Sequence, residues 1–213
     1  WAKLEFSKTE HLTSEGYFTY LKEFKGGHSL NAVAGYSYFE KNGENFNAEN
    51  YDFGVEGLKY WDLESGSYLT DGKAKMGSKK DITERLFALY ARANYSYNDK
   101  YMVTATIRHE GSSKFAAENR WGNFWALSGG WRVSGEEFMK EFDWVNDLKI
   151  RFGYGVTGNN DFDASYMANT LSRDQYWMLP SGSWAFVYGP SSNVNPYLGW
   201  EEKKEWNIGV DYS

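Results

Sequence analysis

A two-residue alternation of apolar and polar side chains runs through most of the chain and constrains its fold more than any other feature. Between Leu86 and Tyr97, Phe87 and Leu89 belong to an apolar register, while Arg92 belongs to the opposite, polar one. Successive side chains of a β-strand point to opposite faces of the sheet, so the pattern predicts strands with one apolar and one polar face. The same alternation is found in residues 30–38, 101–110, 121–133, 148–156 and 206–212, and more weakly in 2–7 and 17–24. These segments predict about eight strands.

The apolar register of the clear strands contains no Asp, Glu, Lys or Arg. The polar register contains Arg92, Arg108, Arg132, Lys149, Arg151 and Asp211. A water-soluble sandwich would turn the apolar register toward a dry core. A membrane barrel would turn it toward lipid, where a charge near the bilayer midplane costs about 2–4 kcal/mol. Both environments exclude charge, so this pattern alone leaves the two folds open.

Aromatic residues make up 19% of the chain and are concentrated near the predicted strand ends. They are Tyr95, Tyr97, Tyr101 and Trp131 toward one side, and Trp121 and Trp206 toward the other. Middle positions of the same register are small, as at Ala91, Ala105 and Gly129, and would fill a sandwich core poorly. Rings at both ends of an apolar band are typical of the aromatic girdles at the two membrane surfaces. This arrangement favours lipid over a dry core.

The predicted connections are short on one side of the sheet and long on the other. They are residues 25–27, 98–99 and 134–146 on one side, and residues 41–83 and 158–202 on the other. Ser134 and Glu137 match a capping box, which predicts a short helix in the third of them. Outer-membrane barrels have this asymmetry, with short periplasmic turns and long extracellular loops.

Composition and motifs argue against several classes of function. The formal net charge of −6 argues against a nucleic-acid partner, which requires an excess of Lys and Arg on one face. The chain has no cysteine, which excludes a disulfide framework, a thiolate metal site and a Cys nucleophile. The glycines of residues 153–158 match a dinucleotide-binding pattern, but no helix is predicted after them. Asn159, Asn160, Asp161 and Asp163 offer oxygen ligands without the spacing of a calcium loop. No histidine or carboxylate pair is spaced for catalysis, so we expect no enzyme activity, cofactor or metal.

The long connection 158–202 contains a group of aromatic residues that we expect to be exposed. They are Tyr176, Trp177, Trp184, Phe186 and Tyr188. Exposed aromatic patches commonly mark an interaction surface, so these residues are candidates for contact with a glycan or peptide ligand, or with a lid protein. Packing of the rings onto the loop itself is the alternative.

Six blocks of the sequence, taken in order, resemble a known family. They are HSLNAVAGYSYFE, ERLFALYARANYSYNDKY, KYMVTATIRHEGSSKF, NRWGNFWALSGGWRVSGEEFM, WVNDLKIRFGYGVTGNN and NPYLGWEEKKEWNIGVDY. Together they resemble the C-terminal barrel part of SusC/RagA-type TonB-linked outer-membrane proteins (TonB-dependent transporters) of Bacteroidetes. The resemblance implies an antiparallel barrel of about 22 strands, plugged by an N-terminal domain and driven by TonB. It also implies import of oligosaccharides or peptides, with a SusD-like lipoprotein closing the top.

We therefore predict that residues 1–213 are part of an all-β, antiparallel transmembrane β-barrel in the bacterial outer membrane, whose plug domain and signal peptide lie outside this chain. The expected partners are outer-membrane lipid, a SusD-like surface lipoprotein, TonB through the absent N-terminal region, and the oligosaccharide or peptide substrate. The side chains predicted to face the lumen are Arg92, Arg108, Lys149 and Arg151. Two alternatives remain open: a self-contained eight-stranded outer-membrane barrel, and a soluble aromatic-rich carbohydrate-binding β-sandwich.

Overall fold

The computed structural model describes residues 1–142, 144–162, 171–190 and 193–213, without the side chains of residues 173–175. The chain divides into two compact units, which we treat separately. Unit 1 contains Trp1–Leu12 and Glu40–Glu84, and unit 2 contains Thr13–Phe39 and Arg85–Ser213. Helices in the described part of the chain are all too short to cross a membrane.

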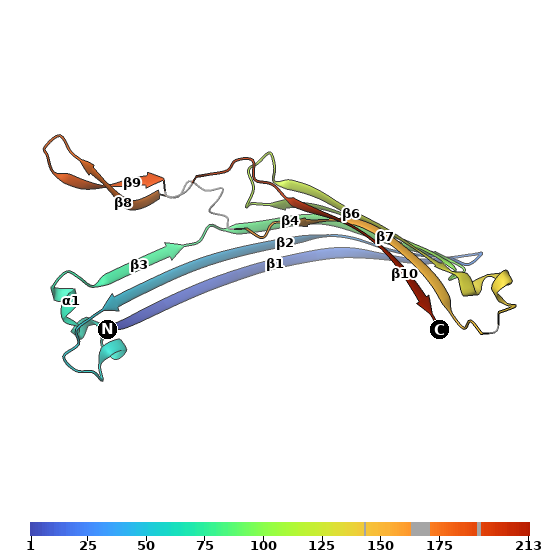
Figure 1. Cartoon of the computed structure of the whole chain (residues 1–213), viewed down its shortest axis with the longest axis horizontal. Coiled ribbons are helices and arrows are strands. Elements are labelled where there is room, and N and C mark those ends of the chain that lie inside the picture. Colours follow the sequence, from blue (N-terminus) through green and yellow to red (C-terminus); the bar gives the residue numbers. More distant parts are fainter. Residues whose placement is uncertain (143, 163–170, 191–192) are drawn as a thin grey trace. The chain divides into compact units, whose positions relative to one another are not determined.

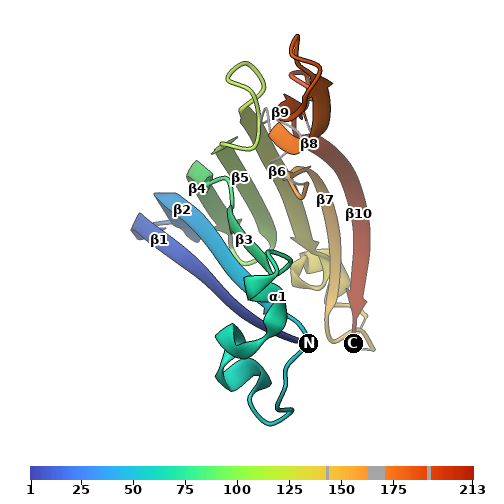
Figure 2. The same cartoon turned by 90° about the vertical axis from the view of Figure 1, so that its left-hand side faces the viewer.

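Of the described strands, seven that lie wholly or partly in unit 2 form one sheet, which confirms the predicted antiparallel meander (Figures 1 and 2). Its strands, in sheet order, are β1 (Ala2–Phe24), β2 (His28–Asn50), β4 (Glu84–Tyr97), β5 (Tyr101–Ser112), β6 (Trp121–Arg132), β7 (Leu148–Asn159) and β10 (Glu201–Tyr212). The first two strands also extend into unit 1. Among the described residues, β1 and β10 pair with no common neighbour and not with each other, so the sheet is not a closed eight-stranded barrel.

The strand register brings the apolar positions onto one face of the sheet. Ala105 lies opposite Ala93 on one side and opposite Leu127 on the other, and Leu127 in turn lies opposite Tyr154. The described residues leave this face uncovered, since the side chain of Leu127 is 49% exposed and those of Leu89, Trp125 and Phe152 are exposed to a similar extent. The exposed apolar face agrees with a surface that contacts lipid.

Few apolar side chains of the described residues are buried. They are Ala2, Ala88, Phe115, Phe124, Val133 and Val156. A water-soluble sandwich must bury one face of each sheet against the other, because the hydrophobic effect is its main source of stability. The structure therefore contradicts the sandwich alternative.

Tight turns lie at one end of the sheet in unit 2, which we call the turn end; the opposite end is the loop end. Gly26 and Gly27 have φ values of 87° and 81°, and Asn98 and Asp99 have φ values of 49° and 53°. Each connection has three residues between its strands, and these left-handed conformations are the ones that Gly, Asn and Asp tolerate best. The Asn98 backbone N–H donates to the Gly27 carbonyl oxygen at 2.7 Å, which joins the two turns. The predicted hairpin is confirmed.

The first predicted strands were too short. Residues 2–7 and 17–24 belong to one strand of 23 residues, β1, and β2 continues to Asn50. The segment joining the two predicted strands, KTEHLTSEG, is polar on both faces, so it lacks the alternation from which a half-buried strand is predicted. This exposed part of the strand carries ion pairs between residues two apart, such as Lys8 Nζ with Glu10 Oε1 at 2.7 Å.

Unit 1 shows that the predicted loop 41–83 is partly sheet. β3 (Lys75–Lys80) pairs antiparallel with residues 44–49 of β2. Between them lie two 3-10 turns, Lys59–Trp61 and Leu63–Ser65, and one helical turn, α1 (Ser67–Thr70). Asn50 is buried, and its Nδ2 donates to the carbonyl oxygens of Leu63 and Gly66 at 2.8 Å each. The Asn50 side-chain amide thus links the segment between β2 and β3 to the end of β2.

The second predicted loop also contains regular structure. Within residues 158–202, β8 (Leu171–Met178) and β9 (Trp184–Pro190) form a two-stranded hairpin. Its turn is closed by the Leu179 backbone N–H, which donates to the Ser183 carbonyl oxygen at 2.8 Å, and Gly182 supplies a φ of 79°. The long connection predicted for residues 158–202 therefore contains a hairpin of its own.

The capping box predicted at Ser134 and Glu137 was also wrong. Residues 133–135 and 137–139 form two 3-10 turns, and Ser134 lies inside the first. Its hydroxyl donates to Asp147 Oδ1 at 2.7 Å, because the chain folds back and brings this carboxylate within reach. Arg132 Nε donates to the same oxygen at 2.7 Å. The Ser134 hydroxyl therefore makes a tertiary hydrogen bond instead of capping a helix.

Candidate functional site

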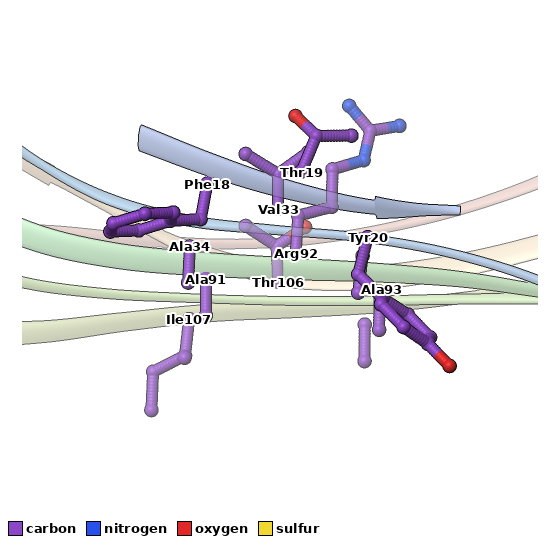
Figure 3. A pocket seen from close by; sticks show the side chains of 12 residues that line it. Phe18, Thr19, Tyr20, Val33, Ala34, Ala91, Arg92, Ala93, Thr106 and Ile107 are labelled. Atoms are coloured by element: carbon purple, nitrogen blue, oxygen red, sulfur yellow. The ribbon is translucent and has the colours of Figure 1, made fainter. Parts of the chain in front are cut away.

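The apolar face of unit 2 has a hollow of about 590 Å³ over β1, β2, β4 and β5. Small side chains at Ala34, Ala91 and Ala93 leave the space, and Phe18 and Tyr20 border it (Figure 3). In this view Ile107 and Arg92 extend from opposite sides of the sheet. Ile107 thus lies on the apolar face and Arg92 on the polar face of the neighbouring strands β5 and β4.

Aromatic side chains border the apolar face at the turn end. His28 Nδ1 lies 2.6 Å from the Tyr95 hydroxyl, and the His28 ring stacks on Tyr97 with centroids 4.5 Å apart. Tyr97 stacks on Tyr101 at 6.3 Å. The rings predicted for this end thus form a row across three strands, together with His28.

Glu136 anchors the same girdle to the turn that follows β6. Its carboxylate accepts hydrogen bonds from the Tyr101 hydroxyl at 2.5 Å, from Trp131 Nε1 at 3.1 Å and from Lys100 Nζ at 3.3 Å. The first two donors hold the pKa of the Glu136 carboxyl below its usual range. Sequence reasoning missed this residue, because nothing in the local pattern around Glu136 indicates that Tyr101 lies beside it.

Glu136→Gln is expected to make the protein less heat-resistant at neutral pH but not in acid. A carboxylate whose pKa is depressed by folding stabilises the fold above its unfolded-state pKa of about 4.3 and loses that contribution as the pH falls further. We expect the gap in melting temperature between the wild type and this variant to narrow below a pH of about 4. Melting curves recorded between pH 7 and pH 3 measure it.

Glu137→Gln provides the matched control for this measurement. Glu137 is the next residue, and its carboxylate accepts from Lys140 Nζ at 2.8 Å on an exposed surface. Exposed pairs of this kind contribute little to stability, so this variant should melt close to the wild type. Equal effects of the two substitutions at neutral pH would contradict the assigned role of Glu136.

Aromatic rings also border the apolar face at the loop end. Trp121 stacks on His109 with centroids 4.8 Å apart and planes 3° from parallel, and it lies nearly perpendicular to the Phe87 ring with centroids 6.3 Å apart. His109 Nδ1 lies 2.8 Å from Asn123 Oδ1, so these two polar side chains of the apolar register satisfy each other. The face therefore has rings at both ends, as predicted, but Trp125, Phe152 and Tyr154 lie among the aliphatic and small residues between them.

The opposite face of the sheet carries the predicted basic residues. Arg108 makes two bonds of 2.8 Å to the Glu110 carboxylate and donates to Ser37 Oγ at 3.3 Å. Arg151 Nη2 lies 2.7 Å from Asp211 Oδ1. That Arg92 and Lys149 share this face with them follows from the register, in which Arg92 lies opposite Thr106 and Lys149 opposite Asp211. Their position facing a lumen stays a prediction.

An aromatic cluster lies at the loop end of unit 2. It was not predicted from the sequence. Phe115, which is 2% exposed, packs on Phe162 at 4.9 Å and on Trp200 at 5.2 Å between centroids. Trp200 also packs edge-on against Phe124 at 5.1 Å, and its indole N–H donates to the Arg120 carbonyl oxygen at 3.0 Å. We call Phe115, Phe124, Phe162 and Trp200 the aromatic node.

The structure places the five predicted contact residues on the β8–β9 hairpin and leaves them exposed. Their exposed fractions lie between 50% for Phe186 and 67% for Trp177 and Tyr188. Tyr176 lies opposite Phe186 in the register, and their rings pack at 4.4 Å. Trp184 and Tyr188 share that face because they lie two residues away on either side, whereas Trp177 lies on the other face. Contact with a ligand or partner stays a prediction.

The dinucleotide-like glycine pattern and the possible oxygen ligands after it can also be located in the fold. Gly153 and Gly155 lie inside β7, and Asp163 lies outside the described residues. Among the residues that the structure describes, no group of three or more His, Asp or Glu side chains could hold a metal ion.

Comparisons with known proteins identify the family. Residues 4–213 match the family model described as "TonB dependent receptor-like, beta-barrel". The chain is 34% identical over 210 residues to TonB-dependent receptor P39 of Formosa agariphila, covering 94% of this chain and 18% of that protein. It is 33% identical over 144 residues to TonB-dependent receptor SusC of Bacteroides thetaiotaomicron, covering 67% of this chain and 14% of that protein. The chain thus spans less than a fifth of the length of these two relatives.

A solved structure has the same fold. The structure of the RagAB peptide transporter superimposes with a TM-score of 0.80 at 20% identity, covering 99% of this chain and 22% of the matched chain. At this identity the likeness supports the fold alone. The family match agrees with the exposed apolar face and its two aromatic borders: the chain belongs to the TonB-dependent receptor β-barrel family and forms part of the barrel wall of an outer-membrane protein.

Proposed function

We propose that the protein containing this chain imports oligosaccharides or peptides across the outer membrane, powered through TonB and assisted by a SusD-like surface lipoprotein. The family match over residues 4–213 carries the proposal. Two similarities support it: to the receptor SusC, and in fold to the RagAB peptide transporter. In this proposal the chain binds and conducts its cargo and catalyses no reaction.

The two faces of the sheet have different roles in this proposal. The apolar face contacts lipid, and the polar face looks into the lumen, where water, the plug and the passing cargo meet its charged side chains. Arg108 is held by Glu110 and Ser37, and Arg151 by Asp211, so their guanidinium groups have defined positions. Fixed charges paired in this way can line a wet channel without the cost of an isolated buried charge.

The β8–β9 hairpin is the proposed contact surface for cargo or the lipoprotein. Residues 176–190 contain no charged residue, although 24% of the chain is charged. Depletion of charge together with enrichment in Trp, Tyr and Met is typical of the centre of a protein interface. The exposed face built by Tyr176, Trp184, Phe186 and Tyr188 has both properties.

Replacing Trp184, Phe186 and Tyr188 together by Ala is expected to reduce uptake or lipoprotein binding about tenfold or more. Large aromatic side chains at the centre of an interface contribute most of its binding energy. Uptake of labelled oligosaccharides and peptides by cells, with and without TonB, measures the first effect, and co-purification of the lipoprotein measures the second. TonB-independent uptake by the wild type would contradict the proposed function.

Trp177→Ala is the matched control for the hairpin. It removes a ring of the same kind, equally exposed, from the opposite face of the hairpin. We expect it to leave uptake and co-purification unchanged, with both variants reaching the outer membrane in normal amounts. If the triple variant behaves like this control, the aromatic face of the hairpin is not the contact surface.

A further inference from the structure

A hollow of about 350 Å³ lies at the loop end of unit 2, where β7 ends and β10 begins. It is lined by two carboxylates, two amides and an apolar wall. Those residues are Asn159, Asp161, Phe162, Asn195, Leu198 and Glu201. We call it the rim pocket, because it lies at the end of the strands that carries the long connections. Its volume is at the lower end of the usual ligand-site range of about 300–1,000 Å³, which suits a single ring-sized group.

The walls of the rim pocket are held in place by the fold beneath them. Phe162 packs on the buried Phe115, which in turn packs on Trp200. Asn159 Nδ2 donates to Glu201 Oε2 at 2.9 Å, across the register pair that joins β7 to β10. A site whose walls are already ordered loses less conformational entropy when a ligand binds.

The polar lining of the rim pocket favours a ligand rich in hydrogen-bond donors and free of negative charge. Asp161 and Glu201 contribute acceptor oxygens, and no Lys, Arg or His is among the described residues that line the pocket. Hydroxyl groups that donate to carboxylates make charge-assisted bonds, which are stronger than neutral ones. A carboxylate or sulfate on the ligand would instead be repelled by both side chains.

The apolar wall distinguishes a sugar ring from a bare cation. Phe162 and Leu198 offer apolar surface for the C–H face of a pyranose, and the carboxylates and amides of the same lining can meet its hydroxyl groups. A metal ion is disfavoured, since the described residues include no group of three metal-binding side chains. The lining therefore offers both kinds of contact that a sugar ring makes, apolar and hydrogen-bonding.

We propose that the rim pocket binds one neutral sugar ring of an oligosaccharide and rejects rings that carry a carboxylate or sulfate. The proposal rests on the import function proposed above and deepens it by naming the charge class of the cargo. Asp161 and Glu201 determine this selectivity, because they supply both the acceptors for hydroxyl groups and the repulsion of anions.

The test measures oligosaccharide binding to the complete receptor in detergent by titration calorimetry. The neutral probes are maltohexaose, cellohexaose and xylohexaose; hexagalacturonate is the anionic probe and hexalysine the cationic one. We expect one of the neutral probes to bind, and Asp161→Asn and Glu201→Gln each to weaken that binding about tenfold or more. Both substitutions should also narrow the preference for the neutral probe over hexagalacturonate.

Glu202→Gln is the matched control, since Glu202 is adjacent to Glu201 and points to the opposite face of β10, 3.8 Å from Lys204. It should leave all affinities unchanged. The proposal is overturned if no neutral probe binds, if Asp161→Asn and Glu201→Gln leave neutral binding unchanged, or if hexalysine binds best and the two variants abolish it. TonB-dependent peptide uptake would then still support the import function. Loss of the rim pocket and loss of the import function are thus separate results.

Discussion

Leu127→Arg is expected to lower the free energy of unfolding of the barrel by about 2–4 kcal/mol, because it puts a charge near the middle of the lipid-facing surface. Leu127 lies in the central part of β6, between the girdle residues Trp121 and Trp131, and its neighbours across the strands are Ala105 and Tyr154. Urea titration of the receptor in lipid vesicles measures the change. The amount of folded receptor in the outer membrane gives a second readout.

Ser128→Arg is the matched control, because it introduces the same side chain one residue further along the strand. Ser128 is exposed and belongs to the register of Arg108 and Arg132, on the polar face. In a water-filled lumen an arginine is tolerated, so we expect little change in stability. If Ser128→Arg proves more damaging than Leu127→Arg, the two faces have been assigned the wrong way round.

Phe115→Ala is expected to destabilise the loop end by about 3–5 kcal/mol, the usual cost of removing a large buried aromatic side chain. Phe115 is 2% exposed and joins Phe162 to Trp200 in the aromatic node. Its removal leaves a cavity at the point where residues 112–120 are held against the ends of the strands. Amide hydrogen exchange in peptides that cover residues 112–120 and 195–200 should become faster.

Phe138→Ala is the comparison for this second substitution. Phe138 is 56% exposed in the 3-10 turn Glu137–Met139 at the opposite end of unit 2, so its removal creates no cavity. Exchange at the loop end should then remain as in the wild type. Unchanged exchange in the Phe115→Ala variant as well would show that the node does not hold the loops.

The membrane-facing strands could be predicted from the sequence because their two faces meet different environments and therefore carry different residue types. Phe87 and Leu89 recur at a spacing of two, and the intervening positions accept charges such as Arg92. The hairpin at Asn98 and Asp99 followed from residue types that tolerate positive φ, and the structure confirms it. These features depend only on local spacing, so the chain carries them without reference to distant residues.

Strands outside the apolar band were not predictable in the same way. The polar part of β1 and the β2 segment that pairs with Lys75–Lys80 are rich in polar residues, so no long apolar alternation marks them. Their hydrogen bonds come from the neighbouring strand. The β8–β9 hairpin was missed for a related reason, since its aromatic residues suggested exposure without indicating that Tyr176 faces Phe186.

The candidate site residues also fall into two groups: those identified from local spacing and those whose roles depend on distant partners. The sequence placed Arg108 and Arg151 in the polar register, and the structure supplied their partners, Glu110 and Asp211. Glu136 and Phe115 were not identified, because their roles come from side chains distant in sequence that the fold brings within contact. Ser134 was assigned the role of a helix cap, which a local motif suggested and a distant carboxylate overrode.

By itself, the sequence determined that this chain forms antiparallel strands with one uncharged face, bordered by aromatic rings, and tight turns at one end. Those properties follow from a period of two and from the cost of charge in lipid, both of which act residue by residue. Only the tertiary structure decided how far the strands extend, which turns are 3-10, and how Phe115, Trp200 and the rim pocket assemble at the loop end. Such contacts join residues far apart in the chain, and their free energy exists only once the sheet has brought them together.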